Sequence, residues 1–189
     1  MMYGTDKASA GHGYCHVYES LLWPLRDEQI TLLEIGVWEG ASLAMWREYF
    51  PHAAIVGLDI DTSRARGDYI EGTHVRQGDT TNDEFIREVI NEYGTFDIVV
   101  DDGAHIAAIS QHEYSLLWPH VAPGGLYFVE DLHTYWWERA NPAGSEEWLF
   151  DLARDCIGRG DSAQDGMTHT TDIESVRFSR CMAVIKKRG

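Results

Sequence analysis

The sequence predicts an α/β protein with a doubly wound, mostly parallel sheet and an antiparallel hairpin near the C-terminus. Short apolar runs, of the kind buried in parallel strands, alternate with amphipathic helical patterns along most of the chain. Several of these runs end in acidic residues, at the point where a strand opens into a loop. In open α/β sheets such loops form the ligand-binding edge. The last two apolar segments alternate residue by residue, which is typical of a hairpin.

Length and charge limit the organisation of the protein and its partners. A chain of 189 residues fits one domain spanning residues 1–189. The chain has 15 lysines and arginines and 31 acidic residues, which gives a net charge of -16. Nucleic acids and anionic membranes would therefore repel it. A small, neutral or cationic molecule is the expected partner, and self-association into a homo-oligomer is left open.

Cysteine usage indicates a reducing compartment. The three cysteines, Cys15, Cys156 and Cys181, are odd in number and far apart, which argues against a disulfide framework or a zinc site. The N-terminus lacks an apolar signal region, and no apolar run approaches the roughly 20 residues of a membrane span. The protein is therefore expected to be cytoplasmic.

The first 27 residues form a predicted N-terminal arm. A polar, glycine-containing loop leads into a helix at about residues 16–25, and the arm is expected to cover an edge of the sheet. A strand at residues 31–35, a glycine turn at 36–42 and an amphipathic helix at 43–50 then make the first strand–helix unit. Pro51 ends that helix.

The same alternation continues to residue 129. The predicted elements are strands at residues 53–61, 73–77, 96–100 and 126–129, helices at 83–93, 110–121 and 146–157, and a hairpin of residues 173–178 and 181–185. We expect five strand–helix units before the hairpin, and right-handed crossovers place helices on both faces of the sheet. Residues 132–171 form an insertion on the substrate side, and its 158–171 portion is a loop.

The turn after the first strand is the first candidate binding segment. It carries Glu34, Gly36, Gly40 and Ser42, and its two glycines stand four positions apart. That spacing is not the GxGxxG pattern of dinucleotide-binding turns, which weakens a dehydrogenase reading. Glycine still allows a sharp turn and the close approach of a ligand. A plain strand-to-helix turn is the alternative.

Acidic residues follow the next two strands in a consistent order. Asp59 ends the second strand about 20 residues beyond the glycine turn, where a carboxylate accepts hydrogen bonds from ribose hydroxyls. Gly78 and Asp79 end the third. This order resembles the class I S-adenosylmethionine-dependent methyltransferases, which have a Rossmann-like fold. The resemblance implies that Asp59 faces the ribose of that cofactor and that Gly78 and Asp79 face its adenine.

Two acidic loops carry the predicted chemistry. Asp102 follows the strand at 96–100, and Glu130 and Asp131 follow the strand at 126–129. Because parallel strands end at a common edge, the three carboxylates are expected to surround one point, which suits a hard divalent cation such as Mg²⁺. His105, three residues beyond Asp102, can exchange a proton near neutral pH and is the candidate base.

Three neighbours of these residues have competing interpretations. Asp101 and Asp102 point in opposite directions on an extended backbone, so we assign Asp102 to the metal and Asp101 to the cofactor or to a helix cap. His133, beside Asp131, is the rival base or a substrate contact. The aromatic segment at 135–137 belongs either to the core or to a platform for a sugar or aromatic ring.

A wider set of motifs is similar to the metal-dependent sugar O-methyltransferases of natural-product and antibiotic biosynthesis. The matching segments lie at residues 3–7, 12–14, 18–19, 33–37, 102–105, 123–125 and 130–134. The resemblance implies S-adenosylmethionine as cofactor, magnesium on Asp102, Glu130 and Asp131, and His105 as the base. Ala104 stands where that family often has serine, and the large N-terminal domain of some members is not expected here.

The resulting hypothesis is magnesium-dependent methylation of a hydroxyl on a glycoside. Magnesium would orient two acceptor oxygens and lower the pKa of the one to be methylated. A catechol or other phenolic diol would chelate the ion equally well and is an alternative acceptor. A non-catalytic S-adenosylmethionine-binding domain is an alternative of a different class.

Overall fold

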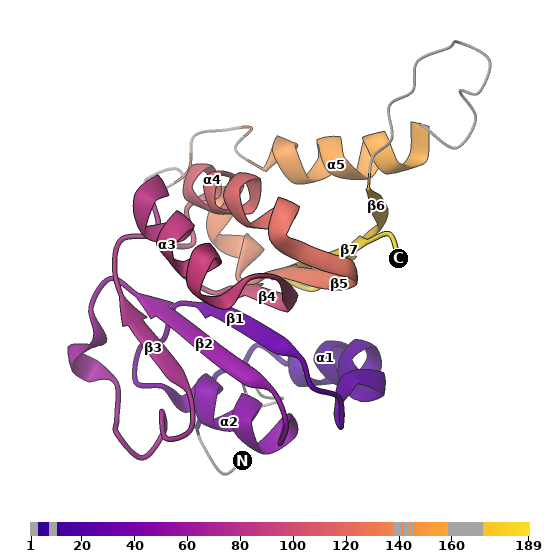
Figure 1. The fold of residues 1–189 in the computed structure, drawn as a ribbon. Helices are drawn as coiled ribbons and strands as arrows, with labels where there is room; N and C mark the ends of the chain where they lie inside the picture. The colour runs from indigo at the N-terminus through magenta and orange to yellow at the C-terminus, as the bar shows by residue number, and fades with distance from the viewer. Residues whose placement is uncertain (1–3, 8–10, 138–140, 142–143, 145, 159–171) are drawn as a thin grey trace.

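The computed structural model describes residues 4–7, 11–137, 141, 144, 146–158 and 172–189. Within these residues, seven strands form one sheet in the order β3-β2-β1-β4-β5-β7-β6 (Figure 1). The strands are β1 (Thr31–Ile35), β2 (Ala54–Asp59), β3 (His74–Gln77), β4 (Phe96–Asp101), β5 (Val121–Val129), β6 (Ile173–Ser179) and β7 (Met182–Lys187). Strands β1 to β5 are parallel, and the β6–β7 hairpin adds to β5 in antiparallel orientation. This confirms the predicted Rossmann-like fold class.

The register of the central strands determines where their loops emerge. Ile35 at the end of β1 pairs with Asp101 at the end of β4, and Asp101 pairs with Val129 at the end of β5. Most side chains of β1, β4 and β5 before these ends are apolar and buried, as strands covered on both faces require, and Glu34 is a buried acid among them. Because β1, β4 and β5 are adjacent, the loops that follow them lie side by side.

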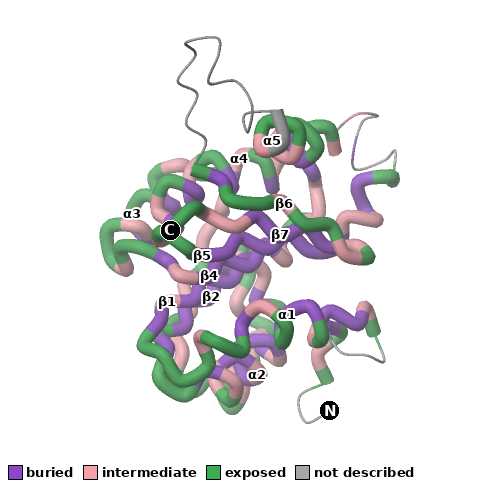
Figure 2. Tube along the Cα trace, turned by 90° about the vertical axis from the view of Figure 1, so that its right-hand side faces the viewer, coloured by how far each residue is buried: buried purple, intermediate pink, exposed green. Residues whose placement is uncertain are grey.

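Helices cover both faces of the sheet. One face carries α1 (Cys15–Leu22) and α2 (Ala41–Tyr49), and the other carries α3 (Asp83–Tyr93), α4 (Ala107–Leu117) and α5 (Glu147–Gly158), as Figure 1 shows. Each layer has its own apolar core, with Trp46 of α2 fully enclosed on the first face and Leu117 of α4 on the second. Figure 2 shows the buried residues concentrated in the strands between these layers.

Two predicted elements differ from the structure. The connection from β2 to β3 contains a 3-10 turn at Thr62–Arg64 and no α-helix, so the expectation of five strand–helix units was wrong for the second unit. The helix predicted at 110–121 begins earlier, at Ala107, and ends at Leu117. Its first amide donates a hydrogen bond of 2.6 Å to the side chain of Asn141, 34 residues away, and local sequence carries no signal for that cap.

The N-terminal arm also takes a different place from the expected one. Helix α1 ends at Leu22 and a 3-10 turn at Trp23–Leu25 follows, because Pro24 cannot continue the helix. Instead of covering an edge strand, α1 packs Tyr18 and Leu22 on the central strands beside α2. Residues 4–7 reach the carboxyl ends of β1, β4 and β5 through contacts described below.

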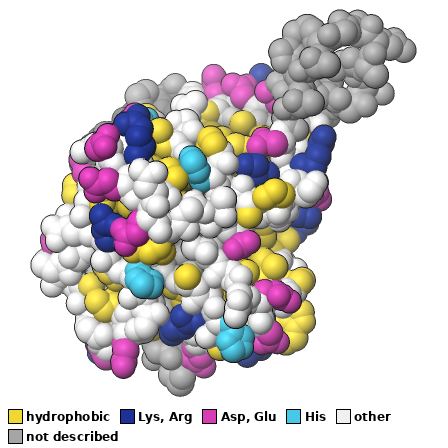
Figure 3. Space-filling view, viewed as in Figure 1, with side chains coloured by type: hydrophobic (Ala, Val, Ile, Leu, Met, Phe, Trp, Pro, Cys, Tyr) yellow, Lys and Arg dark blue, Asp and Glu magenta, His cyan; other side chains and the backbone are white. Residues whose placement is uncertain are grey.

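The exterior is polar and strongly charged. On the face in Figure 3, basic side chains lie among acidic ones. Arg76 and Arg87 form ion pairs with acids of α3. In the described part of the chain, no helix combines the length and apolar character of a membrane span.

Candidate active site

The glycine turn predicted from sequence lies between β1 and α2. Gly36 and Gly40 both have left-handed backbones, with φ of 91° and 90°. A Cβ atom on Gly36 would lie 2.1 Å from the carbonyl oxygen of Asp102. The turn therefore packs directly against the loop after β4, and only glycine allows this approach.

Replacing Gly36 with alanine is expected to destabilise the fold by about 3 kcal/mol or more, since it adds a backbone clash to a strained φ. Chemical unfolding of the variant and the parent measures the difference. Gly94→Ala is the matched control, because Gly94 also has positive φ but an added Cβ would meet no atom within 4 Å. Equal losses in the two variants would contradict the role of the close approach.

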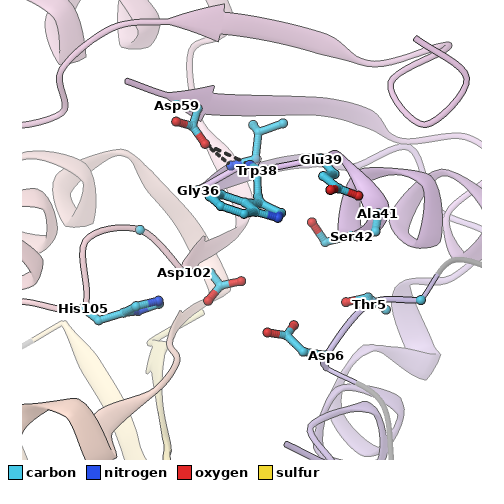
Figure 4. A pocket seen from close by; sticks show the side chains of 13 residues that line it. Thr5, Asp6, Gly36, Trp38, Glu39, Ala41, Ser42, Asp59, Asp102 and His105 are labelled. Carbon is cyan, nitrogen blue, oxygen red and sulfur yellow. Dashed lines mark hydrogen bonds between the residues drawn. The ribbon is translucent and has the colours of Figure 1, made fainter. Parts of the chain in front are cut away.

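A cavity of about 640 Å³ opens over this turn (Figure 4). Its lining includes Gly36, Ser42, Asp59, Asp102 and His105, all predicted site residues. The structure adds residues that sequence reasoning missed. These are Gly4, Thr5 and Asp6 from the N-terminal arm and Val37, Trp38 and Glu39 from the turn.

The carboxylate of Asp59 holds the glycine turn in shape. Its Oδ2 accepts hydrogen bonds from the amides of Val37 (2.8 Å) and Trp38 (2.9 Å), and its Oδ1 accepts one from Asp61 (2.9 Å). Trp38 has φ of 50° and an exposed indole, over which the guanidinium of Arg64 lies. Asp59, which is predicted to contact the ribose, therefore also stabilises the conformation of the turn.

A second, more apolar cavity of about 360 Å³ adjoins the first and shares Gly36, Asp59 and Gly103 with it. Ile60, Asp79 and Ile109 are among its lining residues. Asp79 accepts hydrogen bonds from the amide and hydroxyl of Thr81, which lowers its pKa. Gly78 packs against Phe85, whose ring would lie 2.3 Å from an added Cβ atom.

Asp102, His105 and Asp131 form the acidic centre of the site. Each of the three offers one ligand atom, and these atoms lie within 4.8 Å of one another. His105 Nε2 is 3.7 Å from Asp131 Oδ2. His105 and Asp131 have φ of 53° and 56°. Left-handed conformations are costly outside glycine and tend to occur at functional sites.

The N-terminal arm supplies partners that the sequence reasoning left without a role. Lys7 is completely buried, and its Nζ lies 2.5 Å from Asp102 Oδ2 and 2.8 Å from Glu130 Oε1. The hydroxyl of Tyr18 donates to the same oxygen of Glu130.

Around Asp131, the Tyr14 hydroxyl donates to Oδ1 at 2.7 Å, and the Nδ1 of His12 lies 2.7 Å from that oxygen. Tyr14 and Tyr18 are four apart in sequence, a helical spacing, and they lie in two of the motif segments that carry the family resemblance.

Glu34 and Glu130 are buried and are not among the residues that line the two cavities. Glu34 is fully buried, accepts a 2.8 Å hydrogen bond from Ser42 and lies 3.4 Å from Lys7 Nζ. Burial raises its pKa, which the Lys7 charge partly opposes. Although burial disfavours a charged lysine, the carboxylates of Asp102, Glu130 and Glu34 raise the pKa of Lys7 well above its ordinary value. The ammonium therefore stays charged.

His133 and Asp101 lie outside the group formed by Asp102, His105 and Asp131. The ring of His133 contacts those of His12 and Trp137, at centroid distances of 5.7 and 5.6 Å. Asp101 is buried between β4 and α4, next to Glu113 and Ser110. Of the aromatic segment, Tyr135 is buried in the core, whereas Trp136 and Trp137 are exposed, and their role as a platform stays a prediction.

The neighbouring Glu113 should make stability depend on pH. Burial and the charge of Asp101 raise its pKa from 4.5 to about 9. The folded state then binds more protons than the unfolded state between these values, so the free energy of unfolding falls as pH rises, by at most about 1.4 kcal/mol per pH unit. Glu113→Gln imitates the protonated acid and should flatten this slope. Urea unfolding across the range measures it, with exposed Glu84→Gln as control, and equal slopes in both variants would refute the assignment.

The fold and site together define a Rossmann-like methyltransferase domain. A family model described as a methyltransferase domain matches residues 33–132, which run from β1 to the acidic loop after β5. The chain belongs to this methyltransferase family.

The similar proteins include sugar O-methyltransferases of antibiotic pathways. The chain is 40% identical over 145 residues to mycinamicin VI 2''-O-methyltransferase of Micromonospora griseorubida, covering 71% of this chain and 35% of the relative. It is 35% identical over 211 residues to the 8-demethyl-8-alpha-L-rhamnosyl tetracenomycin-C 2'-O-methyltransferase of Streptomyces olivaceus, covering 100% and 53%. The MycE methyltransferase of the mycinamycin pathway, solved with Mg and SAH, superposes with a TM-score of 0.86 and 31% identity over 99% of this chain and 52% of MycE. The chain thus spans between about a third and about half of the length of these relatives.

Proposed function

We propose that this chain is the catalytic domain of a magnesium-dependent O-methyltransferase that uses S-adenosylmethionine to methylate a sugar hydroxyl of a natural-product glycoside. One observation carries the proposal: Asp102, His105 and Asp131 converge within 4.8 Å of one another at the edge of the glycine-turn cavity. The names of the similar enzymes, which act on glycosylated macrolides and tetracenomycins, support the choice of acceptor.

The cavities suit the chemistry of the donor. Carboxylates of Glu39, Asp59 and Asp102 in the larger cavity favour a cationic sulfonium. The smaller cavity, lined by Ile60 and Ile109 among others, suits an adenine ring. The glycine turn lets the donor approach the backbone, because no side chain stands at Gly36.

The acidic centre suits a hard divalent cation. Asp102 and Asp131 supply the oxygen ligands that Mg²⁺ prefers, and the third member, His105, is free to act as the base if water completes the coordination. Glu130, the third predicted ligand, faces Lys7 and Tyr18, so its contribution to the ion requires these contacts to rearrange. When bound, the cation would polarise the acceptor oxygen and the donor would supply an electrophilic methyl group.

His105 is the base of this proposal. Its imidazole faces the cavity beside Asp102, as Figure 4 shows, and it would accept the proton of the acceptor hydroxyl during methyl transfer. The carboxylate of Asp131, 3.7 Å from Nε2, would stabilise the imidazolium formed. The exposed indoles of Trp136 and Trp137, on the segment that follows Asp131, offer apolar faces to an acceptor sugar.

The proposal is tested by incubating the protein with S-adenosylmethionine, Mg²⁺ and a panel of macrolide glycosides, other deoxysugar glycosides and catechols. Mass spectrometry should detect the gain of one methyl group on a glycoside, and EDTA should abolish it. Methylation of catechols alone would replace the acceptor class. Donor binding without transfer to any acceptor, in a protein that binds Mg²⁺, would favour a non-catalytic binding domain.

A further inference from the structure

The fully buried ammonium of Lys7 joins three neighbouring strands. Its Nζ lies 2.5 Å from Asp102, 2.8 Å from Glu130 and 3.4 Å from Glu34. Glu34 belongs to β1, whereas Asp102 and Glu130 follow β4 and β5, and these strands are adjacent in the sheet. An ammonium has three N–H donors, so its geometry is suited to three carboxylates at once.

The residues around Lys7 belong to the cavity wall. Gly4, Thr5 and Asp6 line the larger cavity, and Figure 4 shows Thr5 and Asp6 across from Asp102. Asp6 and Lys7 are tied to the segment leading into α1, because their carbonyl oxygens accept hydrogen bonds from the amides of His12 (2.8 Å) and Cys15 (3.0 Å). Lys7 is therefore the point at which this wall is fixed to the acids on the opposite side.

We propose that Lys7 is a positioning residue that fastens residues 4–7 across the donor cavity and so retains the bound donor. The proposal rests on donor binding in this cavity, as the proposed function has it. Without the ammonium, the buried carboxylates of Glu34 and Glu130 and the partly exposed one of Asp102 would face one another uncompensated and would separate or take up water. Residues 4–6 would then lose their anchor, and a bound donor would leave through that side.

The same contacts allow a purely structural ion pair, which would affect stability but not donor release. The two roles differ in what happens locally at the cavity. Fastening predicts that donor occupancy and the order of residues 4–7 are linked, so each protects the other. A purely structural pair predicts no such link.

Wild-type protein provides the first measurement. Amide hydrogen exchange at His12 and Cys15, followed by NMR, should slow when S-adenosylhomocysteine is added, because their acceptors lie on the segment that the ligand contacts. Exchange that slows in the glycine turn at 36–42 while these two amides stay unchanged would overturn the proposal. This measurement does not depend on any variant folding.

Lys7→Met provides the second measurement. It should raise the dissociation rate of S-adenosylhomocysteine about tenfold or more and speed exchange at His12 and Cys15. Lys186→Met, which removes an exposed lysine paired with Glu174, should leave both quantities at wild-type values. A wild-type dissociation rate in Lys7→Met would overturn the proposal.

Failure of the proposed function would look different. Wild-type protein that binds no S-adenosylhomocysteine would refute donor binding, and hence donor retention, in this cavity. The anchoring of residues 4–7 by Lys7 would still be tested by amide hydrogen exchange in the absence of ligand. Faster exchange at His12 and Cys15 in Lys7→Met would support it, and unchanged exchange would overturn it.

Discussion

Asp102→Asn is expected to lower the rate of methyl transfer by about a thousandfold. Asp102 lies at the meeting point of the site, since it lines the donor cavity, pairs with Lys7 and belongs to the candidate cation centre. Asparagine keeps the shape but removes the negative charge, and charge stabilisation by a bound cation is worth several kcal/mol. A loss of about 4 kcal/mol corresponds to a factor of about a thousand.

The cation requirement distinguishes this role from a general effect on folding. The Mg²⁺ concentration that gives half of the maximal rate should rise by about tenfold or more in Asp102→Asn, because one anionic ligand is lost. Asp83→Asn removes the same charge from the exposed first residue of α3 and should change neither rate nor Mg²⁺ requirement. Activity that survives both Asp102→Asn and EDTA would remove the metal from the proposal.

The fold was predictable because its determinants are local and repeated. Apolar runs ending in acids gave the strands, and the parallel arrangement brought their loops to one edge, as the pairing of Ile35 with Asp101 and of Asp101 with Val129 confirms. The convergence of Asp102, His105 and Asp131 follows from the same topology. Sequence periodicity therefore predicts the strands and the positions of the loops that carry the site residues.

The remainder depends on contacts between distant segments. Lys7 looked like a loop residue because its partners Asp102 and Glu130 lie 95 and 123 positions away, and no periodic pattern encodes such a pair. The early start of α4 has the same explanation, since its cap comes from Asn141. Besides the motif match of residues 3–7, the sequence offers one hint of a buried counter-ion, which is a lysine in a glycine-containing N-terminal segment of a chain with a net charge of -16.

Adjacent residues of a strand point to opposite sides, and this rule correctly predicts that Asp101 and Asp102 face apart. It does not predict which residues surround Asp101. Asp102 faces the cavity, whereas Asp101 lies on the other side of β4 against Glu113 of α4. The choice between cofactor and helix cap for Asp101 omits a third option, a buried acid pair, because α4 supplies the second acid, Glu113, from twelve positions further along the chain. Its place in cofactor binding stays a prediction, as does that of Glu130 in metal binding.

His105→Asn is expected to slow methyl transfer by between about a hundredfold and ten-thousandfold, the usual contribution of a general base. Asparagine is the appropriate replacement, because His105 has φ of 53° and asparagine tolerates that backbone better than alanine. Binding of S-adenosylhomocysteine should stay near the wild-type value, since the substitution leaves Gly36 and Asp59 untouched. Single-turnover measurements with saturating donor and acceptor report the chemical step directly.

His133→Asn tests the rival base on the same scale. The ring of His133 stacks edgewise with Trp137 and His12, so its loss should cost less than about tenfold in rate. A large loss in His133→Asn with a small one in His105→Asn would exchange the two roles. The affinity for Mn²⁺ separates base from ligand at His105, because a side chain that holds the cation cannot also take the acceptor proton. Unchanged Mn²⁺ affinity in His105→Asn, together with the slow chemical step, would leave Asp102 and Asp131 as the protein ligands and His105 as the base.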